Sequence, residues 1–233
     1  MGYHKMRRRG KEFCPDSATI EDAKPFMEKP AASKAACNIE RCIRCSAKSD
    51  LFKRHDIRKR IFYLIAEQIV VATVCFLIRW KCSQCGKTFT DYPDFALPYK
   101  RYTAPTVASY CRQYVEDESA SYRSLTKRYP IGREGAEETG AGLRHTTIWR
   151  WISTLGRYGE TVREALENFA GKIEWTSIPN DLENLAVSPR KYRSECRKRT
   201  LIRCRFLCQL ENLCKKVLHT ASFLDFSLGR PPG

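Results

Sequence analysis

The chain has 233 residues, of which 42% are hydrophobic and 29% charged, and its formal net charge is +16. This composition predicts a globular protein of one large domain or a few small ones, and argues against a disordered or fibrous chain. The positive charge favours an acidic polymer as partner, most often nucleic acid. A basic protein without such a partner is the alternative.

The first stretch of the chain, residues 1–36, is basic at its start and then polar, with prolines at 15, 25 and 30. This composition predicts a flexible basic arm. No apolar segment follows the first basic residues, so no secretory signal peptide is expected. We therefore expect an intracellular protein, cytoplasmic and associated with the nucleoid.

Two Cys-x-x-Cys pairs bracket the next region. The chain has twelve cysteines, and in a reducing compartment such pairs indicate metal ligands rather than disulfides. Two pairs supply four thiolates, enough for a closed tetrahedral zinc site. We predict a zinc ribbon over residues 37–92, with a β-hairpin of about ten residues per strand between the pairs. The predicted ligands are Cys42, Cys45, Cys82 and Cys85.

The apolar run between the two pairs, residues 61–78, is long enough to suggest a membrane span. Glu67 and Gln68 lie at its centre, and a carboxylate at the bilayer midplane is costly. The run is also rich in β-branched and aromatic residues, so two strands that turn near residues 66–68 explain it better. We expect no contact with a membrane.

Proline and aromatic residues predict a packed, extended linker over residues 93–104. Helical periodicity then begins at Pro105, which suits the first turn of a helix. Ser119 or Ser121 can cap a second, short helix that ends near Pro130. A loop with four glycines follows, and a third helix completes a predicted helix-turn-helix over residues 105–158.

The third helix has an apolar face of Ile148, Trp151, Ile152 and Leu155, with Thr146 as the expected N-cap. Its other face carries short polar side chains and arginines, as a helix that reads the major groove requires. An ordinary amphipathic helix is the alternative. The predicted DNA contacts on this helix are Thr146, Thr147, Arg150, Ser153, Thr154 and Arg157.

Residues 159–233 predict a basic helical extension and tail. We expect Gly156 and Gly159 to end the third helix, a further helix over 161–170, and a last helix over 189–219. The basic first half of this last helix can lie along the phosphates of a nucleic acid. The predicted contacts there are Arg190, Lys191, Arg193, Arg197 and Lys198. A second metal site at Cys196, Cys204, Cys208 and Cys214 is the less favoured alternative to free, buried thiols.

Three segments of the chain, at residues 81–90, 95–102 and 145–152, resemble a bacterial family of proteins linked to mobile elements. A fourth segment, residues 188–195, is also similar to that family. It pairs an N-terminal zinc ribbon with a helix-turn-helix and resembles the DNA-binding region of insertion-sequence transposases. The resemblance spans roughly residues 40–218 and implies binding to double-stranded DNA more strongly than it implies a biological role.

The sequence thus predicts an α+β protein: a small four-cysteine zinc ribbon, an all-α helix-turn-helix and a C-terminal helical extension. We expect a zinc-stabilised, mobile-element-associated DNA-binding protein that does not itself cut DNA, because no carboxylate set for phosphodiester cleavage is recognisable. A transcriptional regulator with the same modules, and a complete or truncated transposase, are the alternatives. Besides double-stranded DNA, the expected partner is a second copy of the chain in a homodimer or a partner transposase subunit.

Overall fold

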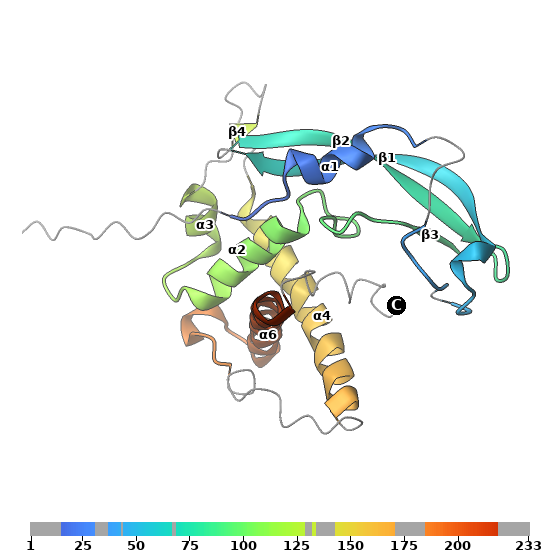
Figure 1. Ribbon diagram of the computed structural model, residues 1–233. Helices are drawn as coiled ribbons and strands as arrows, with labels where there is room; N and C mark the ends of the chain where they lie inside the picture. Colours follow the sequence, from blue (N-terminus) through green and yellow to red (C-terminus); the bar gives the residue numbers. More distant parts are fainter. Residues whose placement is uncertain are drawn as a thin grey trace, which may run out of the picture.

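The computed structural model describes residues 15–30, 37–42, 44–66, 69–128, 132–133, 143–170 and 185–218. It is a mixed α+β structure, as predicted at that level (Figure 1). A long antiparallel hairpin forms the upper part of the view, and the larger helices gather below one of its ends. The four cysteines of the two Cys-x-x-Cys pairs lie at the other end, beside the short strand β3.

The hairpin consists of β1 (Phe52–Ala66) and β2 (Ile69–Cys82), paired from Phe52↔Cys82 to Ala66↔Ile69. The prediction of two strands in the apolar run is therefore confirmed, although the strands are longer than about ten residues. Within the described part of the chain, no helix combines the length and apolar character needed to span a membrane. The pairing is irregular between Arg54 and Asp56, where one residue of β1 has no partner in the ladder.

Two short strands occupy the other edge of β2. β3 (Thr88–Thr90) pairs with it antiparallel near the cysteines, and β4 (Gly132–Arg133) pairs with it in parallel at Ile69 and Val70. Neither strand was predicted, because strands of two or three residues are too short to show a periodic pattern. β3 adds a third strand to the sheet at the end where the cysteines lie.

The prediction of a flexible N-terminal arm is wrong for part of its length. Helix α1 (Ile20–Met27) begins with a capping box between Thr19 and Asp22 and packs on the hairpin. Ala23 is fully buried, and the Phe26 ring meets Phe95 edge-on, with 6.0 Å between the ring centres. Pro25 lies inside this helix, where the apolar contacts offset its lost backbone hydrogen bond. Residues 1–14 and 31–36 lie outside the described residues.

The predicted packed linker joins the sheet to the helices. Phe95, Ala96 and Leu97 are buried, and the Tyr63 amide of β1 donates to the Arg101 carbonyl, 2.7 Å away. The Tyr102 ring lies edge-on against Tyr63 on one side and Trp151 on the other, 5.2 Å between centres in both cases. Aromatic contacts therefore connect the sheet directly to the third predicted helix.

In the described part of the chain, five helical segments follow the linker. They are α2 (Ala104–Glu116), α3 (Tyr122–Arg128), α4 (His145–Ala170), the 3₁₀ turn η2 (Pro189–Lys191) and α6 (Glu195–Leu218). The Ser124 amide donates to Ser121 Oγ at 3.0 Å, so Ser121 caps α3, one of the two predicted caps. The last helix begins at Glu195, not at Pro189, because residues 189–191 form the separate turn. Most of the predicted glycine-rich loop, residues 134–142, lies outside the described residues.

The prediction that Gly156 and Gly159 end the third helix is wrong. α4 runs through both glycines, and the predicted separate helix over 161–170 is its second half. A Cβ atom built at Gly156 would lie 2.6 Å from the Thr200 carbonyl oxygen of α6, so a side chain has no room there. The two glycines let the α4 and α6 backbones approach closely, a tertiary requirement that overrides their low helix propensity.

Candidate metal centre and nucleic-acid interface

The four cysteines lie on two loops that repeat the same backbone geometry. In the first loop the Ser46 amide donates to the Cys42 carbonyl at 2.9 Å, and the Cys42 amide donates to Ala47 at 2.8 Å. In the second, Gly86 and Lys87 make the equivalent bonds with Cys82, both at 2.9 Å. Ser46 and Gly86 both have positive φ, 57° and 71°. Each loop is thus a tight turn that aims two sulfur atoms the same way.

The two loops bring four Sγ atoms together. Cys42 and Cys85 are 3.6 Å apart, Cys45 and Cys82 are 3.7 Å apart, and all four atoms lie within 4.8 Å of one another. A tetrahedron of sulfurs about 2.3 Å from a zinc ion has edges of about 3.8 Å. The spacing therefore fits a four-thiolate metal centre, and a site of four protein ligands leaves no position open for substrate.

The protein environment shifts the pKa values of two of the four thiols in opposite directions. The backbone amides of Arg44 and Cys45 lower the pKa of the Cys42 thiol to about 6. The pKa of Cys45 is raised to about 12: the Ala47 amide lowers it, but burial and the sulfurs of the other three cysteines outweigh that effect. The Cys42 thiolate therefore forms more readily than that of Cys45, and a bound cation would displace the proton of Cys45.

An aromatic cluster packs beside the four cysteines. Phe52 and Phe89 meet edge-on with 4.9 Å between ring centres, and Trp80 is buried beside them. Cys37 packs on this cluster, and burial raises the pKa of its thiol to about 11. It therefore stays protonated and lies apart from the four clustered sulfurs. Among the residues that the structure describes, these four cysteines are the one group of three or more His, Cys, Asp or Glu side chains spaced for a metal ion.

The second candidate region is the N-terminal half of α4. All four side chains predicted to face inward, Ile148, Trp151, Ile152 and Leu155, are at most 2% exposed. Thr146, Arg150 and Arg157 are exposed, whereas Thr147 is half-buried. Because the helix begins at His145, Thr146 lies in its first turn and is not the N-cap, which corrects that prediction. Trp149 is also exposed, at 49%.

Two other predicted contacts on α4 have partners within the protein. Ser153 Oγ donates to the Trp149 carbonyl and accepts from Arg197 Nη1 at 3.1 Å. Thr154 Oγ1 donates to the Arg150 carbonyl and accepts from Lys100 Nζ at 3.2 Å. The fully exposed ridge of α4 is therefore narrower than predicted, and its cationic members are Arg150 and Arg157.

Some of the DNA contacts predicted in the basic extension are also exposed, whereas others have partners within the protein. Arg190 and Arg193 are exposed. Lys198 forms an ion pair with Glu195 at 3.2 Å. Lys191 donates to the carbonyls of Tyr114 and Asp117, at the end of α2.

Arg197 also has partners within the protein. It donates to Ser153 and to the Tyr122 hydroxyl, and its guanidinium lies 5.2 Å from the centre of the Trp149 ring. Lys191 and Arg197 thus tie the extension to α2, α3 and α4, a use that a charge pattern does not reveal.

Three thiols gather in the helical core without forming a metal set. Cys111, Cys204 and Cys208 are buried, and the Cys111 and Cys204 thiols interact. Burial raises the pKa of Cys111, so this thiol remains protonated at neutral pH. Cys196 is exposed, and the Cys214 side chain is outside the described part. Among described residues, nothing supports the alternative of a second metal site.

Sequence reasoning missed the turn that precedes α2. The Lys100 amide donates to the Leu97 carbonyl at 3.1 Å, with Pro98 and Tyr99 between them. Tyr99 has φ 63° and is 78% exposed. This is the pattern of a type II turn, whose third position normally holds glycine or asparagine. Proline at residue 98 was a signal for the turn, but the tyrosine concealed its type.

One comparison with known proteins gives a match. The model of a domain of unknown function (DUF6431) matches residues 42–129, which is less than half of the chain. The match begins at the first cysteine of the cluster, covers β1, β2, β3, α2 and α3, and ends before β4 and α4. Searches of curated proteins and of solved structures found nothing similar at the required significance.

Proposed function

We propose that this protein binds double-stranded DNA, with a zinc ribbon at the cysteine cluster and a helix-turn-helix formed by α2, α3 and α4. The observation that carries the proposal is the division of α4 into two faces. Its inner face packs in the core that α2 and α3 share, while its first turns expose Thr146 and Arg150. A recognition helix needs this rigid support behind an exposed, cationic N-terminal half.

The helix-turn-helix assignment rests on the packing of the three helices. α3 is short and contacts both α2 and α4, and Leu125 of α3 is fully buried in their common core. The connection between α3 and α4 is longer than the usual turn of three or four residues. Arg197 compensates for this length, because it bonds to α3 through Tyr122 and to α4 through Ser153.

The zinc assignment rests on donor chemistry and geometry. Four thiolates at these spacings favour zinc among the common cellular divalent cations. In our proposal the ion has a structural role, since the β1–β2 hairpin depends on packing at both ends and isolated hairpins are marginally stable. The ribbon would then fix the hairpin, and base recognition would lie on α4.

The biological setting follows from the resemblance to mobile-element proteins. We propose that the chain recognises element DNA without cutting it. Among the described residues no carboxylate belongs to a group of three or more side chains spaced for a metal ion. The two aspartates that follow α4 in the sequence, Asp181 and Asp225, lie outside the described residues. A transcriptional regulator uses the same modules and differs in its target. A complete or truncated transposase differs in chemistry, and metal-dependent nicking of element-end DNA by the pure protein would establish it.

Selection of bound duplexes from a random-sequence pool tests the proposal. We expect enrichment of a defined sequence, and two inverted half-sites would indicate that a homodimer binds. A pool that remains random after repeated rounds would contradict sequence recognition. Comparing the enriched sequence with the inverted ends of a neighbouring mobile element then separates the transposition role from that of a regulator.

A further inference from the structure

We infer that the 97–100 turn and α4 form a phosphate clamp, in which Lys100 and Arg157 bind a backbone phosphate of the same DNA duplex that α4 reads. This inference rests on the proposed function and adds a defined backbone contact to it. Its contact residue Lys100 lies in the linker, outside the helix-turn-helix itself.

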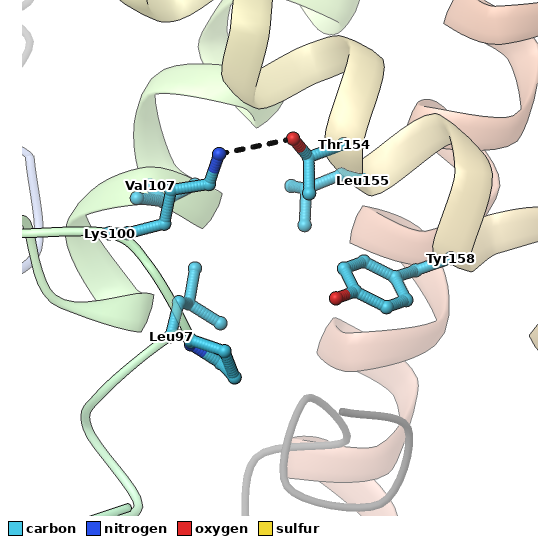
Figure 2. A pocket seen from close by; sticks show the side chains of 7 residues that line it. Leu97, Lys100, Val107, Thr154, Leu155 and Tyr158 are labelled. Carbon is cyan, nitrogen blue, oxygen red and sulfur yellow. Dashed lines mark hydrogen bonds between the residues drawn. The ribbon is translucent and has the colours of Figure 1, made fainter. Parts of the chain in front are cut away.

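The first observation is the position of Lys100. Figure 2 shows its side chain extended toward α4, where Nζ donates to Thr154 Oγ1 at 3.2 Å. Beside it Leu97, Leu155 and Tyr158 line a small apolar pocket. The ammonium group is thus held against the helix instead of moving freely in solvent, so binding an anion costs less side-chain entropy.

The second observation is a ridge of positive charge on α4. Positions 150, 154 and 157 share one side of a helix, because three- and four-residue steps return to the same face. Arg150 and Arg157 therefore flank the threonine that Lys100 contacts, and both arginines are exposed. They lie roughly 10 Å apart along the helix axis.

The third observation is that no carboxylate in the described part of the chain neutralises these charges. Among the described residues, no carboxylate lies within ion-pair distance of Lys100, Arg150 or Arg157. Burial, and then the charges of Arg157 and Arg150, lower the pKa of Lys100. Three like charges that repel one another are stabilised by an anion placed between them, and a phosphodiester supplies one.

The fourth observation is the strained backbone at Tyr99. A tyrosine with φ 63° is less stable there than glycine or asparagine would be. The turn that contains Tyr99 places Lys100 against α4, and Tyr99 is 78% exposed. Backbone strain of this kind clusters at functional sites.

The clamp and the reading helix are expected to affect DNA binding in different ways. A phosphate contact adds affinity for every sequence and contributes about 0.9 to the slope of log K against log salt concentration. A base contact changes the preference at one position. The two roles are therefore separable in the same protein.

The test measures binding to a mixed-sequence duplex and to the selected duplex, between about 50 and 200 mM salt. The variants are Lys100→Gln, Arg157→Gln and the double variant. Lys24→Gln, an equal charge change at an exposed position of α1, is the matched control. Thermal unfolding checks that each variant is folded, and the exposed Arg157 keeps the test valid if Lys100→Gln is unstable.

We expect the double variant to reduce the salt slope by about 0.9, because Lys100 and Arg157 share one phosphate, and each single variant by no more than that, equally on both duplexes. Lys24→Gln should match the wild type. Normal binding with an unchanged slope in the double variant would overturn the clamp but leave the proposed function intact. If the wild type binds neither duplex, the proposed function fails and the clamp fails with it.

Discussion

Gly156 of α4 lies directly against the Thr200 carbonyl of α6: a Cβ atom at residue 156 would be 2.6 Å from that oxygen. Gly159 faces the Arg203 carbonyl in the same way one turn further along. The α4–α6 contact therefore depends on the absence of two side chains. Because α6 carries Arg197, which also bonds to α3, this contact supports the face of α4 proposed to meet DNA.

Gly156→Ala tests that contact. Alanine has the better helix propensity by about 1 kcal/mol, so an unpacked position would become more stable. Here we expect a loss of about 1–3 kcal/mol, because the new methyl group forces the helices apart. The free energy of unfolding, from denaturant titration, measures the effect. Thr161→Ala, on the exposed side of the same helix, should stay within about 0.5 kcal/mol of the wild type.

The two cysteine loops provide a reciprocal test of backbone strain. Ser46 and Gly86 occupy equivalent positions with positive φ. Nothing lies within 4 Å of a Cβ atom at Gly86, so an added side chain there meets backbone strain alone. We expect Ser46→Gly to stabilise and Gly86→Ser to destabilise the zinc-loaded protein, each by roughly 1 kcal/mol. Shifts of the unfolding midpoint in the same direction for both variants would contradict the equivalence.

Zinc analysis of cysteine variants tests the metal centre. The wild type should contain about one zinc per chain, and Cys42→Ser should lose most of it, because one of four ligands is removed. Chelation should lower the unfolding temperature of the wild type but have little effect on Cys42→Ser. The control is Cys196→Ser, whose thiol is exposed on α6 and away from the cluster. A wild type that contains no metal and is indifferent to chelator would contradict the assignment.

Arg197→Lys separates positioning from charge. Lysine keeps the positive charge but cannot donate to Ser153 and Tyr122 together while lying over Trp149. We expect a loss of about 1–3 kcal/mol in unfolding free energy. DNA affinity should fall by a factor that does not depend on base sequence. Arg193→Lys, at an exposed position before α6, should change neither quantity measurably.

The sequence predicted best where a pattern is local. Two Cys-x-x-Cys pairs were enough to place four sulfurs together, because each pair closes its own turn. The hairpin was predicted from a run rich in β-branched and aromatic residues with Glu67 and Gln68 at its centre. The inner face of α4 followed from helical spacing at Ile148 and Trp151. In these cases the sequence signal is local, although the two cysteine pairs are brought together by the hairpin between them.

Prediction failed where a residue serves a distant partner. Gly156 looked like a helix terminator because its contact with Thr200 is invisible in sequence. Residues 20–27 looked unstructured because their helix depends on the surface of the hairpin. The intramolecular partners of Lys191 and Arg197 were also missed, because a count of charges does not reveal acceptors within the protein. Their DNA-binding role stays a prediction, as do those of Arg190, Arg193 and Lys198.

Arg150 offers the most direct test of the central claim that α4 reads DNA. Arg150→Ala should cost about 1–3 kcal/mol on the selected duplex and relax the preference at one base position. Arg190→Ala, which removes an exposed charge outside α4, should weaken binding to all sequences alike. The measurement is a binding profile over every single-base variant of the selected site, at fixed salt. An Arg150→Ala profile identical to that of the wild type would contradict the claim.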